Sequence, residues 1–130
     1  MSTLPFMTLV PGRTAEVTTQ VTPEDTAASL GSGDVPVLGT PRLIALCEAA
    51  TVAALEGALD PGQTSVGTRV VFDHTRATPV GIAVTAVATL EAVDGRRLTF
   101  NVSATDDEGP IGSGSIVRFV VDRDRFLGTR

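Results

Sequence analysis

A long run of apolar side chains extends from Leu43 to Leu55, and few charges interrupt it. Thr40-Pro41 stands before this run, where threonine suits a helix N-cap and proline suits the first helical position. Gly57 and the Asp-Pro-Gly turn at 60–62 follow it and are typical of a helix end. The pattern predicts one long helix. Because that helix is apolar on nearly all sides, we expect it to be buried on nearly all sides.

Five other segments have the composition or the alternation of strands, namely residues 13–21, 65–74, 81–93, 96–105 and 111–121. Asp94-Gly95 is a hairpin signal, and the alternation from Leu98 to Ala104 gives its strand one wet face. Residues 22–39 are punctuated by glycine and proline, which predicts a long loop with one helical turn near 24–30. The order of elements predicts an α+β fold in which a curved antiparallel sheet wraps a long central helix.

The length and the composition are those of one ordinary domain, since the chain has 130 residues of which 42% are hydrophobic. We expect residues 1–130 to form that single domain, with flexible ends at 1–12 and 127–130. The formal net charge is −5, all ten basic residues are arginine, and tryptophan and tyrosine are absent. This composition argues against nucleic acid or an anionic membrane as a partner.

The first residues lack a basic segment followed by a long apolar stretch, and no run of about 20 apolar residues exists. We therefore expect neither a signal peptide nor a membrane span. Cys47 is the only cysteine and cannot form an internal disulfide. A cytoplasmic, reducing location fits it.

Two side chains stand out as candidates for chemistry. His74, the only histidine, closes a predicted strand and could act as a general base at neutral pH, although an exposed strand-end histidine has the same appearance. Glu48 lies among apolar helical neighbours, where burial of a carboxylate is costly unless it is paired. The alternative for Glu48 is a helix-edge position beside water or an arginine.

Other residues carry weaker signals. Thr40 has a structural role as the predicted N-cap, yet a helix start also offers free N–H groups that could hold a carbonyl or a carboxylate. Gly67 sits inside a predicted strand, which indicates a bulge or a close backbone approach. Arg118 could meet a phosphate or carboxylate, or lie in solvent. Cys47 packs mid-helix as a small hydrophobe, and no cluster has metal-ligand spacing.

Long stretches of the chain resemble the fluoroacetyl-CoA thioesterase family of hotdog-fold proteins. They are GTPRLIALCEAATVAAL, PGQTSVGTRVVFDHTRATPVG, DGRRLTFNVSATDDEGPIGSGSIVRFVV and DRDRF, which together cover most of residues 38–126. The most specific parts are the G-T-x-V-x-x-x-H-T-x-A-T-P-x-G segment at 67–81 and the G-R-R-L…V-S-A…I-G-S-G run at 95–114.

This resemblance implies a hotdog fold and hydrolysis of an acyl-CoA to a carboxylate and CoA, without a metal or redox cofactor. It implies catalytic roles for Thr40, Glu48 and His74, and it places the family's active-site glycine on Gly67 and its strand arginine on Arg118. It also implies at least a homodimer, with the site between subunits. His74 would be the general base, Glu48 a nucleophile or a second base, and Thr40 would orient Glu48 or bind the acyl carbonyl.

One segment departs from the family pattern. The fluoroacetyl-specific enzyme has an aromatic lid before the threonine, whereas here the region reads SLGSGDVPVLGT, without phenylalanine. We therefore expect a short or small acyl-CoA substrate rather than the fluorinated one. The alternative is a non-catalytic hotdog protein that binds an acyl group or another small ligand. A hotdog dehydratase would also use a histidine and a carboxylate, but the motifs match the thioesterase branch.

Overall fold

The computed structural model describes residues 9–128. The chain order is β1 (Thr14–Gln20), η2 (Pro23–Asp25), α1 (Ala27–Leu30), α2 (Thr40–Ala54), β2 (Gln63–His74), β3 (Ala83–Asp94), β4 (Arg97–Asp106), β5 (Gly109–Asp122) and α3 (Arg123–Leu127). The long helix and all five predicted strands are present, with bounds that differ from the predicted ones by a few residues. The helix α3 was not predicted, because its sequence reads only as a charged tail.

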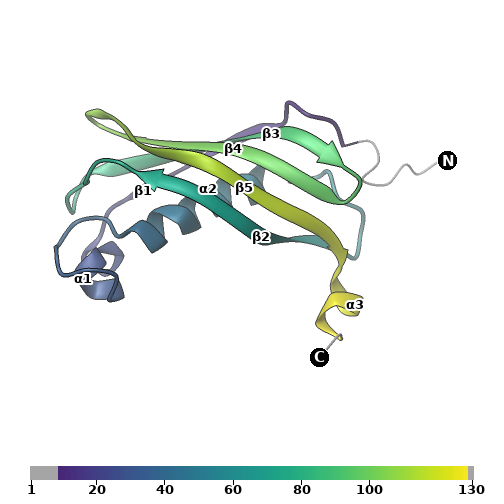
Figure 1. Ribbon diagram of the computed structural model, residues 1–130, viewed down its shortest axis with the longest axis horizontal. Coiled ribbons are helices and arrows are strands. Elements are labelled where there is room, and N and C mark those ends of the chain that lie inside the picture. Colours follow the sequence, from purple (N-terminus) through teal and green to yellow (C-terminus); the bar gives the residue numbers. More distant parts are fainter. Residues whose placement is uncertain (1–8, 129–130) are drawn as a thin grey trace.

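The five strands form one antiparallel sheet in the order β1-β3-β4-β5-β2. The sheet is curved, and α2 lies along its concave face (Figure 1). This is the predicted α+β arrangement of a hotdog fold. β1 and β2 are the two edges of the sheet, so the outer side of each has no strand partner within residues 9–128.

The core lies between α2 and the sheet. From α2 it receives Leu43, Cys47 and Ala50, each 0% exposed, and from β4 it receives Leu98 and Phe100, also 0% exposed. The alternating burial along β4 agrees with the predicted wet face. This packing fixes the rotation of α2 about its axis, and it therefore decides which helical side chains face outward.

The expectation that α2 is buried on nearly all sides is wrong for the single chain. Ala45, Ala49 and Val52 are exposed, and Val52 is 52% exposed. These residues follow one another at a spacing of four and three, so they lie on one face of the helix. The sheet covers only the opposite face, which leaves an apolar stripe uncovered.

The predicted cap of α2 is also wrong. The N-cap is Gly39, with Thr40 as the first helical residue and Pro41 as the second, and no side chain forms a cap hydrogen bond. Gly39 approaches Ala27 closely, since a Cβ added to it would lie 3.2 Å from the Ala27 backbone. Thr40 therefore does not cap the helix with its hydroxyl.

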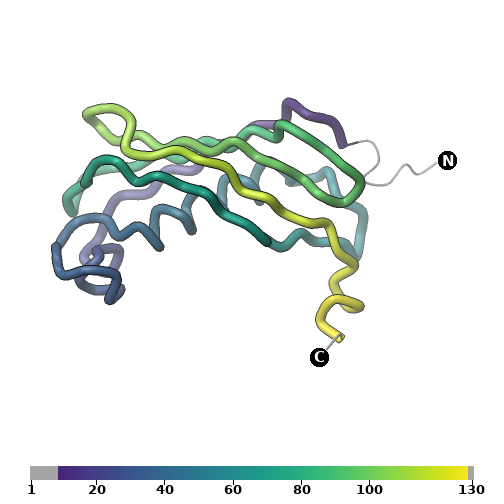
Figure 2. The backbone as a smooth tube through the Cα atoms, viewed as in Figure 1, coloured from purple at the N-terminus to yellow at the C-terminus, as the bar shows by residue number. Residues whose placement is uncertain are grey.

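Segments distant in sequence gather at one end of the sheet. The region of α1, the segment after β2 and the turn between β4 and β5 all lie there, while α3 lies at the other end (Figure 2). Residues 1–8 and 129–130, where most of the predicted flexibility falls, lie outside the described residues. Leu9, by contrast, is 5% exposed and joins the core. Among residues 9–128, no helix is both long and apolar enough to cross a membrane.

Candidate active site

Thr40 and His74 form a direct pair. Thr40 opens α2 and His74 closes β2, and the Thr40 Oγ1 lies 2.8 Å from the His74 Nδ1, which is hydrogen-bond distance. Both residues line a pocket of about 270 Å³. Its other walls come from α1, from the loop before α2 and from the segment after β2: Ala27, Ser32, Val35, Val37, Leu38, Thr75, Arg76 and Ala77. The Thr40 hydroxyl, which does not cap α2, is thus within hydrogen-bond distance of the His74 imidazole.

The other ring nitrogen of His74 is enclosed. Nε2 is buried and has no hydrogen-bond partner within residues 9–128. Burial lowers the pKa of His74 from its ordinary value of 6.5, and a backbone hydrogen bond with Arg76 opposes that effect only in part. This shift favours the neutral imidazole, which is the form that can accept a proton.

Glu48 and Arg118 form a second pair, on α2 and β5. The Glu48 Oε2 lies 3.7 Å from the Arg118 Nη1, and the Arg118 side chain is only 8% exposed against 37% for Glu48. Arg118 is further held by Ser65, whose Oγ accepts from Nε at 2.9 Å and whose carbonyl accepts from Nη2 at 3.0 Å. Burial lowers the pKa of Arg118, and the nearby Glu48 carboxylate opposes this. The carboxylate is thus held by a buried cation.

Gly67 leaves the space that Glu48 occupies. A Cβ added to Gly67 would lie 2.5 Å from the Glu48 Oε2, closer than side chains tolerate. Gly67 is paired with Arg118 in the β2–β5 register, and the register shifts between Gly67 and Arg69. A glycine inside a strand indicates a bulge or a close approach, and at Gly67 the structure has both.

The bulge decides which face of the sheet His74 occupies. Gly67 pairs with Arg118 and His74 pairs with Gly112, and Arg118 and Gly112 are an even number of residues apart on β5. Gly67 and His74 are seven residues apart, which in a regular strand would place them on opposite faces. The extra residue, Thr68, restores both to the face that α2 covers.

The candidate residues thus form two clusters instead of one. Thr40 pairs with His74, while Glu48 packs against Arg118 and Gly67. Thr40 and Glu48 are eight residues apart on α2, which corresponds to about 12 Å along the helix axis. Within one chain, the two clusters are therefore separated by about two turns of α2.

Sequence reasoning missed the residues that support the clusters. Ser65 carried no signal, because a serine in a strand is common, and its role depends on the position of Arg118 across the β2–β5 ladder.

Cys47 is buried, and burial raises its pKa to about 11, so its thiol is poorly suited to act as a nucleophile. No group of three or more His, Cys, Asp or Glu side chains in the described part of the chain is arranged to hold a metal ion.

The fold is shared with solved hotdog structures. A hot-dog-like protein from Thermanaerovibrio acidaminovorans superposes with a TM-score of 0.82 at 24% identity, over 90% of this chain and 87% of that one. A mutant of the fluoroacetyl-CoA-specific thioesterase, crystallised with fluoroacetate and CoA, superposes with a TM-score of 0.86 at 35% identity, over 91% of this chain and 99% of that one. The architecture therefore defines a hotdog-fold protein of the thioesterase type.

The sequence comparison narrows this class to one family. The family described as fluoroacetyl-CoA-specific thioesterase matches residues 21–124. The fluoroacetyl-CoA thioesterase of Streptantibioticus cattleyicolor is 43% identical over 90 residues, which are 69% of this chain and 65% of that protein. The matched segment thus spans slightly less than two thirds of that relative. The chain belongs to the fluoroacetyl-CoA-specific thioesterase family.

Proposed function

We propose that this protein hydrolyses the thioester of a small acyl-CoA, giving a carboxylate and free CoA. The observation that carries the proposal is the 2.8 Å contact between the Thr40 hydroxyl and a histidine whose pKa is lowered. A neutral imidazole that accepts from a hydroxyl is the usual arrangement for moving a proton away from an attacking oxygen. Family membership supports thioester chemistry at this site.

The complete site belongs to a homodimer in this proposal. β2 is an edge strand in which Val71 is 51% exposed. Gly67 begins the exposed part of β2, and the half-buried His74 ends the strand. Antiparallel pairing of two β2 strands about a two-fold axis near Val71 sets Gly67 of one subunit opposite the partner's His74. Each Glu48 cluster then faces a Thr40–His74 pair, and the two half-sites make one site.

The uncovered stripe on α2 supports the same assembly. Ala45, Ala49 and Val52 are small or β-branched apolar residues that a partner can cover without burying a charge. A long exposed edge strand is an aggregation risk unless something pairs with it. A dimer that uses β2 and this face of α2 removes both unfavourable exposures together.

The proton moves through the Thr40–His74 pair. As water attacks the thioester carbon, its proton passes to the Thr40 Oγ1 while the threonine proton passes to the His74 Nδ1. The carbonyl becomes an oxyanion, which backbone N–H groups near Gly67 or at the start of α2 stabilise. Collapse of this intermediate breaks the C–S bond, and the CoA thiolate takes the proton from the imidazolium.

Glu48 acts on the same carbonyl from the second half-site. It either orients the attacking water as a base, or attacks the carbon itself to form a mixed anhydride that water then hydrolyses. Arg118 holds the carboxylate in place, and the bare Cα of Gly67 gives the acyl group access to it. Acid quenching during turnover, followed by peptide mass spectrometry, separates the two roles, because only the anhydride adds the acyl mass to Glu48.

The substrate is a short acyl group without selection for fluorine. The pocket beside Thr40 and His74 has walls of Ala27, Val35 and Val37, and none of its described lining residues is aromatic. Its volume of about 270 Å³ lies just below the usual range for ligand sites. The lone, buried Cys47 supports a reducing compartment, and so the cytoplasm, as the place of this activity.

A panel of acyl-CoAs tests the proposal, with released CoA detected by a thiol reagent. Acetyl-, propionyl-, butyryl-, fluoroacetyl- and long-chain acyl-CoA should be compared with wild-type protein and with Glu48→Gln. We expect saturable CoA release from the short members, no large preference for fluoroacetyl-CoA, and loss of most activity in Glu48→Gln. Saturable binding without CoA release from any member would instead support the non-catalytic binding protein.

A matched variant separates catalysis from folding in that assay. Glu56→Gln also removes one carboxylate near the end of α2, but Glu56 is exposed and forms no ion pair in the described part of the chain. It should release CoA at the wild-type rate. If Glu48→Gln lowers only the melting temperature and keeps the wild-type turnover, Glu48 is structural.

A further inference from the structure

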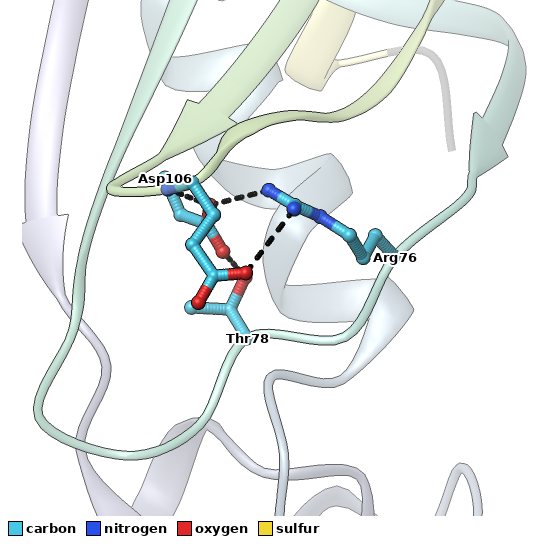
Figure 3. A network of polar contacts seen from close by, with 4 residues as sticks. Arg76, Thr78 and Asp106 are labelled. Atoms are coloured by element: carbon cyan, nitrogen blue, oxygen red, sulfur yellow. Dashed lines mark hydrogen bonds and ion pairs between the residues drawn. The ribbon is translucent and has the colours of Figure 1, made fainter.

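Asp106, at the end of β4, is the centre of a polar network (Figure 3). Its Oδ1 accepts from the Arg76 Nη2 at 2.7 Å and from the backbone N–H of Glu108 at 2.9 Å, and its Oδ2 accepts from the Thr78 hydroxyl at 2.8 Å. The Asp106 side chain is 4% exposed and Thr78 is 0% exposed. Both carboxylate oxygens of Asp106 thus accept hydrogen bonds, and the carboxylate is buried.

The two side chains that bind Asp106, those of Arg76 and Thr78, belong to the segment that follows His74. Arg76 is two residues after His74, and its guanidinium forms a second, longer contact with Glu108 at 3.4 Å. Thr78 is two residues further along. The position of the chain just after the histidine is therefore tied to the turn between β4 and β5 by a buried carboxylate.

The same segment also holds the chain that leads into Thr40. The Thr78 carbonyl accepts from the Leu38 N–H at 2.9 Å, and Val37 forms a bridge with Pro79. Leu38 lies two residues before Thr40. The Asp106 network therefore restrains, through one segment, the approaches to both members of the 2.8 Å Thr40–His74 pair.

We propose that Asp106 is a positioning residue for the Thr40–His74 pair and acts through Arg76 and Thr78. It touches neither reacting group, so its effect is on the geometry of the pair and on the enclosure of the imidazole. Its consequence for catalysis rests on the proposed thioesterase function, whereas its consequence for His74 does not. An asparagine at 106 has nearly the same shape but loses the charge and one of the two acceptor oxygens.

The test uses the fact that His74 is the only histidine. Its ring C–H signal in ¹H–¹³C NMR spectra is therefore assigned without ambiguity, and its titration can be followed in any variant. In wild type the midpoint should lie below 6.5, because the imidazole is partly buried. In Asp106→Asn we expect the midpoint to move back toward its ordinary value of about 6.5, because the segment after His74 is no longer held and water reaches the ring.

Asp107→Asn is the matched control. Asp107 is the next residue, is exposed, and makes no hydrogen bond or ion pair in the described part of the chain. Asp107→Asn changes the net charge by the same amount as Asp106→Asn, so any long-range effect of charge on the His74 titration appears in both variants. Asp107→Asn should titrate as wild type does.

Turnover supplies the second readout. Asp106→Asn should lower kcat by about ten- to hundredfold with a small change in KM, because misplacement of a reacting pair by about 1 Å has an effect of this size. Thr78→Val should give a smaller loss of the same kind, and Thr78→Ser, which keeps the hydroxyl, should restore most of it. If Asp106→Asn does not fold, the comparison of Thr78→Val with Thr78→Ser still tests whether the network positions the Thr40–His74 pair.

The outcomes separate the two proposals. If wild type hydrolyses no acyl-CoA but Asp106→Asn shifts the His74 titration, the proposed function fails and the positioning role stands. If both Asp106→Asn and Thr78→Val keep the wild-type His74 titration and the wild-type kcat, and only the melting temperature falls, Asp106 is merely structural and the inference is overturned.

Discussion

At the scale of single residues, the hydroxyl of Thr40 and the backbone at Gly67 have the largest consequences. Thr40 lies inside the first turn of α2 rather than before it, which frees its hydroxyl from capping and gives it to His74. Gly67 has no side chain where Glu48 needs space. Position 40 requires a hydroxyl to contact His74. Position 67 requires the hydrogen of glycine, because any side chain would meet Glu48.

The pH dependence of turnover tests the role of His74. The base must be neutral to accept a proton, and burial lowers its pKa below 6.5. Lowering the pH through that pKa protonates the imidazole, so kcat/KM should be level near neutral pH and fall at acid pH, with a midpoint below 6.5. In His74→Ala, turnover should fall by about 10²–10⁴-fold and the acid limb should disappear. Unchanged turnover would remove His74 from the mechanism.

Alanine substitution of two glycines separates activity from stability. In Gly67→Ala the new methyl group meets the flexible end of Glu48, so we expect the fold to remain and CoA release to fall. In Gly114→Ala the methyl group meets the backbone of Val71 and Phe72, which cannot yield, so stability should fall by about 1–3 kcal/mol. Chemical denaturation and the CoA-release assay on both variants check this. An active Gly67→Ala would contradict the proposed role of the close approach.

At the scale of elements, the helix and the strands could be predicted from pattern, because α2 and β4 each have a simple periodicity. Gly67 indicated a bulge or a close approach, but the position of the extra residue, Thr68, could not be predicted, because a strand glycine does not say on which side of it the register shifts. That shift places Gly67 and His74 on one face. The Asp106 network was also beyond sequence reasoning, since Asp106 reads as an ordinary turn residue and its partners lie about 30 positions away.

The uncovered face of α2 gives a prediction about this element. Val52→Arg places a charge at one end of the stripe that also includes Ala45 and Ala49, where a partner subunit would have to bury it. The variant should fold, because Val52 is 52% exposed in the single chain, but it should sediment at half the mass of wild type and lose activity. Asp107→Arg, on the exposed β4–β5 turn, is the control and should remain dimeric. A wild type that sediments as a monomer would contradict the assembly.

At the scale of the whole molecule, the separation of the two clusters matters more than the details of either. Within one chain, Thr40, which contacts His74, and Glu48 are eight residues apart on α2, about 12 Å along the helix axis. In the proposed isologous dimer, the same surface patch of both subunits meets across a two-fold axis, so each carboxylate lies beside the other subunit's imidazole. The proposed dimer then has two sites, and each depends on both chains.

Mixing two inactive variants tests this arrangement directly. Glu48→Gln lacks the carboxylate and His74→Ala lacks the imidazole, so each homodimer should have no intact site. In a mixed dimer, one site combines both defects, while the other combines the Glu48 of one subunit with the His74 of the other and is intact. After exchange of equal amounts, half of the dimers are mixed, so CoA release should return to about one quarter of the wild-type rate. If each site were instead built within one chain, every site in the mixture would lack one group, and no activity would return.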